Sequence, residues 1–123
     1  MTGQVANLRA VMPVTFHLTG RPDLTLEFVI DTGFSGALAL PPAAVAALGL
    51  PFLEDTFANL ANDQTVAVPV YTATVMWHGV ERVVRVLAVG RRPLLGTALL
   101  NENHLGIDFI EGGDVAITPH SRP

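Results

Sequence analysis

Short runs of β-type residues, each bounded by turn residues, constrain the fold of this chain more than any other feature. The run Leu24–Ile30 first alternates and then becomes fully apolar, as a strand does when it enters a core. Gly, Pro, Asn and Asp punctuate the chain between such runs. Strands are predicted over Val14–Thr19, Leu24–Ile30, Thr56–Leu60, Thr65–Val70, Tyr71–Trp77, Val80–Val89, Ile107–Ile110 and Val115–Ile117. Short helices are predicted at Pro41–Leu48 and within Leu94–Leu100, so the fold class is all-β, closed or sandwiched.

The composition favours one folded domain and gives no sign of a nucleic-acid partner. No linker or charge block divides the 123 residues, so we expect a single domain over residues 1–123. Half of the residues are apolar and only 15% are charged, which excludes an intrinsically disordered chain. The seven basic residues are all arginines, and they are scattered rather than gathered in a stripe. The net charge of −4 indicates no particular partner.

Several kinds of chemistry lack the residues that they need. The chain has no cysteine, which excludes disulfides, thiolate metal sites and a cysteine nucleophile. The four histidines lie far apart in the sequence and form no metal-binding pair, so we expect no metal and no cofactor. Ser35 and Ser121 are the only serines, and neither lies in the Gly-x-Ser-x-Gly pattern of serine hydrolases.

An uncharged stretch between Asp31 and Glu54 is long enough to cross a bilayer. However, Pro41 and Pro42 near its middle would break a spanning helix, so we interpret it as a strand end, a loop and a short buried helix. The N-terminus shows no basic patch followed by a long apolar run, so no secretory signal is expected and the predicted location is cytoplasmic. The mean hydropathy of +0.44 then suggests surface hidden in a partner subunit.

The tripeptide Asp31-Thr32-Gly33 is the strongest candidate for a site. It follows the apolar residues at the end of the predicted strand Leu24–Ile30, so the carboxylate stands where the backbone leaves the core. Gly33 allows a tight turn that brings backbone N–H groups close to the carboxylate. Thr32 can fix the loop through its hydroxyl, and Ser35 is a second hydroxyl within reach of Asp31. Alone, such a tripeptide is an ordinary loop after a strand.

A second motif, Leu94-Leu95-Gly96, follows a predicted hairpin with the tip Ala61-Asn62-Asp63-Gln64. This order of an apolar strand with Asp-Thr-Gly, a hairpin, and two apolar residues with Gly before a helix resembles the retropepsin-like aspartic proteases. Gly36–Pro41 and Leu48-Gly49-Leu50 look like the bacterial members of that group. The resemblance extends from about Val14 to Ile117 and implies a small closed β-barrel with one short helix after each motif.

The chain departs from the viral members of that group at three places. Phe34 follows the tripeptide where those members carry a small residue. Ser35 and Thr97 stand where they carry an acidic residue and an arginine that pair, so both partners of that ion pair are absent together. The predicted hairpin tip is polar rather than rich in glycine.

The resemblance implies an aspartic endopeptidase, in which two carboxylates share one proton and activate a water molecule. Asp31 would be the catalytic residue, with Thr32, Gly33 and Ser35 supporting its loop and Leu94, Leu95 and Gly96 bracing it from below. The tip residues Ala61, Asn62, Asp63 and Gln64 would cover a peptide or protein substrate. No other aspartate lies in the same frame, so the second carboxylate must come from Asp31 of another copy, which predicts a homodimer.

Two other interpretations are open. The unusual tip and Phe34 are compatible with a binding or dimerisation module that keeps the fold without cleaving peptides. The chain could also be an unrelated small β domain within a larger membrane assembly, although it contains no predicted membrane segment of its own.

Overall fold

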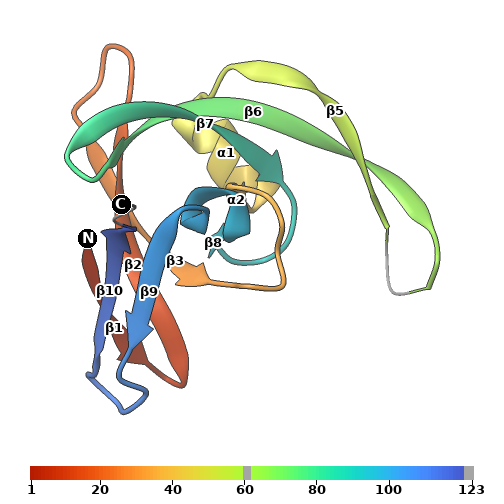
Figure 1. Ribbon diagram of the computed structural model, residues 1–123. Helices are drawn as coiled ribbons and strands as arrows, with labels where there is room; N and C mark the ends of the chain where they lie inside the picture. Colours follow the sequence, from red (N-terminus) through yellow and green to blue (C-terminus); the bar gives the residue numbers. More distant parts are fainter. Residues whose placement is uncertain (60–61, 121–123) are drawn as a thin grey trace.

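The computed structural model describes residues 1–59 and 62–120. Within them, ten strands and two short helices follow one another along the chain (Figure 1). Their bounds are β1 Thr2–Ala6, β2 Arg9–His17, β3 Leu24–Ile30, β4 Leu38–Leu40, α1 Pro42–Leu48, β5 Phe52–Asn59, β6 Thr65–Trp77, β7 Val80–Ala88, β8 Leu94–Leu95, α2 Thr97–Leu100, β9 Asn103–Ile107 and β10 Asp114–Pro119. The predicted mainly β fold is confirmed.

The strands form one sheet in the order β5-β6-β7-β4-β8-β3-β2-β1-β10-β9. Most neighbours are antiparallel, whereas β8 runs parallel to β3 and β4 runs parallel to β7. An additional pairing between β6 and β2 folds the sheet back on itself. In Figure 1, β6 and β7 arch over α1 and α2, and β1, β2, β9 and β10 stand at the left. Complete closure into a barrel stays a prediction, because β5 and β9 each have one neighbour among the described strands.

The core follows from the period-two pattern of the strands. On β2, Met12, Val14 and Phe16 are fully buried, and the residues between them face outward or lie at the margin. The rings of Phe16 and Phe28 stack with their centroids 5.9 Å apart, which joins β2 to β3. All three residues of β4 are buried, because this strand lies between β8 and β7 in the middle of the sheet.

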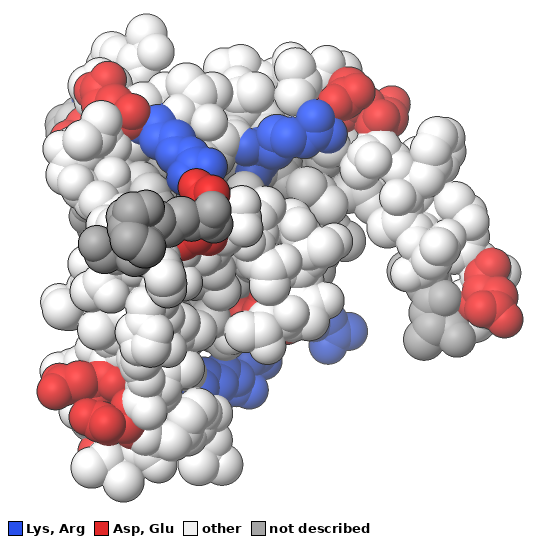
Figure 2. Space-filling model, viewed as in Figure 1, with Lys and Arg blue, Asp and Glu red and all other residues white. Residues whose placement is uncertain are grey.

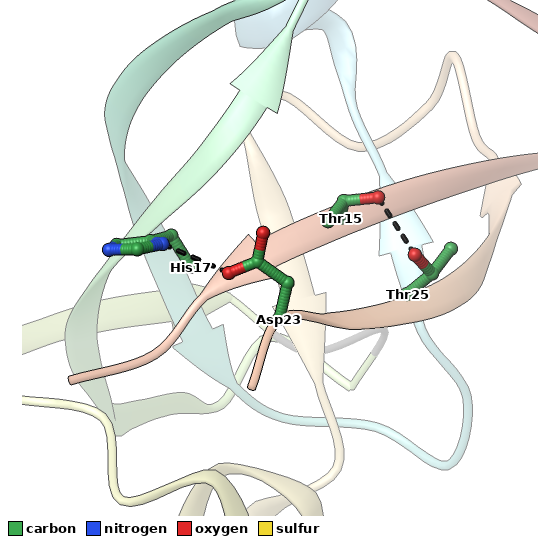
Figure 3. A network of polar contacts seen from close by, with 4 residues as sticks. All are labelled: Thr15, His17, Asp23 and Thr25. Carbon is green, nitrogen blue, oxygen red and sulfur yellow. Dashed lines mark hydrogen bonds and ion pairs between the residues drawn. The ribbon is translucent and has the colours of Figure 1, made fainter. Parts of the chain in front are cut away.

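Two polar contacts join β2 to the chain around β3, away from the core (Figure 3). The hydroxyls of Thr15 and Thr25 lie 2.8 Å apart on β2 and β3, and His17 Nδ1 lies 2.9 Å from Asp23 Oδ1 at the turn between the strands. The His17 and Asp23 side chains are half exposed, so their contact contributes little stability.

Several predicted elements are confirmed with their bounds nearly unchanged. β3 covers the predicted Leu24–Ile30, and α1 begins one residue after the predicted Pro41. Gly49 ends α1 in the left-handed conformation with φ 64°, which glycine adopts without strain. The uncharged stretch folds as a loop, a strand and a short helix, and no helix in the described part of the chain is long and apolar enough to cross a membrane.

Other predicted bounds were wrong. β2 begins at Arg9 rather than Val14, and β1 and β4 were not predicted. The two strands predicted on either side of residue 70 are one strand, β6, because Pro69 lies where β6 pairs with β5 but not yet with β7. β9 ends at Ile107, so the next three residues form a turn instead of the end of a strand.

Candidate active site

Asp31 stands directly after β3, in a loop that binds its own carboxylate. The Gly33 amide donates to Asp31 Oδ1 at 2.9 Å, and the Phe34 amide donates to the Asp31 carbonyl at 3.1 Å. A Cβ on Gly33 would lie 3.2 Å from Asp31 Oδ1, a tight contact for the oxygen that the amide holds. The side chain is therefore oriented by the backbone of its own turn, as a short polar side chain can be in an Asx turn.

The Leu94-Leu95-Gly96 motif lies directly beside this loop, because β8 fits between β3 and β4. Ile30 pairs with Leu95 in parallel register, and Leu38 pairs with Leu95 on the other side. The Asp31 amide donates to the Leu95 carbonyl at 2.9 Å, and the Val29 amide donates to the Pro93 carbonyl at 3.0 Å. The two sequence motifs, far apart along the chain, thus form one hydrogen-bonded unit.

Gly96 is where the two motifs come closest. A Cβ at this position would lie 2.3 Å from the Gly36 carbonyl oxygen and 2.5 Å from the Phe34 carbonyl oxygen. The Gly96 amide also donates to the Ala37 carbonyl at 2.9 Å. Only a residue without a side chain lets the two loops approach this closely.

Thr97 continues the brace at the start of α2. Its amide donates to the Phe34 carbonyl at 2.8 Å, and its hydroxyl donates to the same oxygen at 3.2 Å. The Ala98 amide donates to the Gly36 carbonyl at 3.1 Å. A neutral hydroxyl and two amides therefore hold the Phe34–Gly36 segment without an ion pair between positions 35 and 97.

Phe34 is accommodated by a neighbouring glycine. A Cβ on Gly36 would lie 2.5 Å from the Phe34 ring, so the ring occupies the space that a side chain there would need. The dependence of Phe34 on Gly36 and Gly96 was missed from the sequence. Gly36, two residues after the bulky Phe34, was a local signal for the first of these contacts. The contact with Gly96 had no such signal, because nothing in the sequence places Gly96 next to the Phe34 loop.

The other loop residues expose their hydroxyls. Thr32 and Ser35 are exposed, and in the part of the chain that the structure describes neither hydroxyl has a hydrogen-bond partner. Ser35 therefore makes no hydrogen bond to Asp31 in this conformation.

The predicted hairpin is β5 and β6, which project from the body at the right of Figure 1. Asn59 pairs with Thr65 at its outer end, where the Thr65 hydroxyl donates to Asn59 Oδ1 at 3.0 Å. Asn62, Asp63 and Gln64 are exposed at the tip, and the Gln64 amide donates to Asn62 Oδ1 at 3.2 Å. Ala61 lies outside the described residues.

The fold of this chain is similar to that of a solved retropepsin-like aspartic protease. The structure of such a protease from Rickettsia conorii matches it with a TM-score of 0.54, covering 94% of this chain and 91% of that chain. The sequence identity is 17%, so the likeness concerns the fold. No protein-family model matches the sequence, and no curated protein sequence matches it significantly.

Proposed function

We propose that this chain is an aspartic endopeptidase that cleaves peptide bonds as a homodimer. The observation that carries the proposal is the position of Asp31, at the end of β3 in a loop braced by Leu95, Gly96 and Thr97. A retropepsin-like fold adds support, because a loop of this kind in that fold is where a catalytic aspartate is expected.

The chemistry needs a second carboxylate. Two carboxylates at close range cannot both ionise comfortably, so they share one proton. The ionised partner takes a proton from a bound water, and the protonated partner donates to the carbonyl oxygen of the scissile bond. Since Asp31 is the only aspartate in an Asp-Thr-Gly frame, the second carboxylate is Asp31 of another copy.

The remaining residues support these two carboxylates. Gly33 and Phe34 fix the turn through their amides, and Leu94, Leu95 and Gly96 support it from the neighbouring strand. The exposed hydroxyl of Thr32 is available to bind the opposite loop across the dimer axis, and Ser35 is available to the carboxylate or the substrate.

The substrate is a peptide in extended conformation beneath the β5–β6 hairpin. An extended peptide gains backbone hydrogen bonds much as an added strand does. The tip residues Asn62, Asp63 and Gln64, together with Ala61, would cover it. On β5, Phe57 is 74% exposed and offers an apolar surface for its side chains.

The decisive experiment replaces Asp31 by asparagine. In a peptide-library cleavage assay, Asp31→Asn should lower the rate by about 10³-fold or more, because it removes the acid–base pair. Asp23→Asn is the matched control, because Asp23 is an exposed aspartate at the turn between β2 and β3. Cleavage by the Asp31→Asn protein at the wild-type rate would refute the proposal.

The alternative is a binding or dimerisation module with the same fold. The polar, exposed tip at Asn62–Gln64 favours it. Under this alternative, neither the wild type nor the Asp31→Asn protein cleaves any peptide in the library, while both bind the same partner.

A further inference from the structure

Three large apolar side chains stand exposed at two neighbouring turns. Leu8 is 84% exposed in the turn between β1 and β2, and Phe109 and Ile110 are 59% and 70% exposed in the turn between β9 and β10. We refer to Leu8, Phe109 and Ile110 as the end cap. Figure 1 shows both turns at the lower end of the molecule.

The two turns are held together, so the end cap is one surface. The Val5 amide donates to the Gly113 carbonyl at 2.9 Å, and the Gly112 amide donates to the Val5 carbonyl at 2.8 Å. The Asn7 amide donates to Glu111 Oε2 at 3.0 Å, which joins the tips of the turns.

Leu8 is unfavourable at its position in an isolated chain. Its φ of 64° lies in the left-handed region, where leucine is strained and asparagine is tolerated. Its side chain is also almost fully exposed, so neither backbone preference nor burial within one copy accounts for it.

Strand register places the end cap at the same end of the sheet as Asp31. Val29 pairs with Val11, so continuing the antiparallel register sets Arg9 opposite Asp31. The turn after β1 therefore lies just beyond the level of Asp31. Gln4 pairs with Asp114 and Val115 pairs with Ile107, which brings the second turn to that end as well.

An interface of ordinary area that includes Asp31 is wide enough to include the end cap as well. Strands lie about 4.8 Å apart, so in the order β3-β2-β1-β10-β9 the turn after β1 is roughly 5–10 Å to the side of β3 and the turn between β9 and β10 roughly 14–19 Å. A stable interface covers about 800 Å² on each partner, which corresponds to a patch about 28 Å across. The chain exposes 7456 Å², whereas a compact monomer of its mass exposes about 6,400 Å². The projecting hairpin and the exposed side chains of the end cap are both part of this surface.

We infer that the end cap is the surface on which a second copy of this chain docks when the two Asp31 loops meet. The inference rests on the proposed function, which requires another copy at the Asp31 end of the sheet. In a two-fold interface the same patch occurs on both copies, so Leu8 of one copy packs against apolar end-cap residues of the other.

Charges around the end cap suit such a contact. Arg9 and the carboxylates of Asp108 and Asp114 form no ion pair within the described residues. All three flank the end cap in sequence, and Figure 2 shows acidic atoms gathered at the lower left, over the turn between β9 and β10. In an antiparallel pair of copies, Arg9 of each faces the acidic turn of the other.

The test measures dimerisation of the full chain by sedimentation velocity over a range of concentrations. Leu8→Asn and Phe109→Asp should each raise the dimer dissociation constant about tenfold or more. At concentrations where wild type and variant are both monomeric, Leu8→Asn should also keep or raise the thermal midpoint, because asparagine suits the left-handed φ. Val80→Asp is the control, because Val80 is 67% exposed at the turn between β6 and β7, remote from the end cap.

The possible results separate this inference from the proposed function. Leu8→Asn protein that dimerises as tightly as the wild type overturns the inference, and so does a wild type that stays monomeric at every concentration. If Leu8→Asn breaks the dimer but the wild type cleaves no peptide, the docking surface stands and the endopeptidase proposal fails. If cleavage depends on dimerisation but Leu8→Asn and Phe109→Asp do not weaken the dimer, the endopeptidase proposal stands and the docking surface fails.

Discussion

At the scale of single residues, the surroundings of Asp31 depend on the glycines at least as much as on the acidic group. Gly33 leaves room for the amide that holds the carboxylate, and Gly96 leaves room for two carbonyl groups of the Phe34–Gly36 segment. The position of the carboxylate thus depends on the absence of side chains at Gly33 and Gly96.

Gly96→Ala should therefore disturb the site from the neighbouring strand. The new Cβ would overlap the Gly36 and Phe34 carbonyl oxygens, so the loop must move, at a cost of about 1–3 kcal/mol in the free energy of unfolding. Urea denaturation measures this loss, and the cleavage rate should fall with it. Gly106→Ala is the control, because the nearest atom to its Cβ would be 3.8 Å away. Equal effects of the two substitutions would contradict this account.

The shared proton predicts how activity depends on pH. The active pair carries one proton, so acid inactivates it by adding a second and alkali inactivates it by removing the first. A profile of kcat/KM against pH should be bell-shaped with an acidic optimum. A rate that still climbs above neutrality would count against a carboxylate pair.

At the scale of elements, the sequence predicted those helices and strands that have a strong hydrophobic period or are bounded by turn residues. β3 and α1 have clear patterns, and the hairpin formed by β5 and β6 is marked by the polar run after residue 61. β4 and β8 are too short to show a period, and the burial of β4 on both faces follows from its neighbours. The end of β9 was placed wrongly because Phe109 and Ile110 are apolar but belong to an exposed turn.

The candidate site likewise has a part that the sequence predicted and a part that it did not. Asp31, Gly33 and Gly96 could be singled out because the order of their two motifs resembles that of the retropepsin-like aspartic proteases. That Leu95 accepts the Asp31 amide, and that Thr97 holds the Phe34 carbonyl, depend on the parallel pairing of β3 and β8. Parallel pairing joins distant segments without a turn between them, so no short-range signal reports it.

Phe57 on β5 tests the role of the hairpin. Because this side chain is 74% exposed, Phe57→Ala should change the free energy of unfolding by no more than about 0.5 kcal/mol. If the hairpin covers the substrate, KM for an extended apolar peptide should rise while the thermal midpoint stays constant. Phe52→Ala offers a contrast, because the Phe52 ring packs edge-on against Tyr71 with 5.6 Å between centroids and should cost stability instead. An unchanged KM in the Phe57→Ala protein would argue against substrate contact by β5.

At the scale of the whole molecule, a site made of two identical halves predicts how mixtures behave. When wild-type and Asp31→Asn proteins exchange subunits in equal amounts, about a quarter of the dimers keep two Asp31 carboxylates. The activity should fall to about a quarter of that of the same total amount of wild type. Mixing with Asp23→Asn protein should cause no such loss. A fall to about one half would mean that each copy acts alone.

The continuity of β6 has a mechanical consequence. This single strand of 13 residues is held by β7 from Val70 to Trp77, whereas its outer part from Thr65 to Pro69 pairs only with β5. The hairpin is therefore fixed to the rest of the sheet at residues 69–70 and unsupported beyond them. A small rotation of the backbone at residues 69–70 produces a larger displacement at the outer end, so changes near Pro69 should displace that end more than changes made at the end itself.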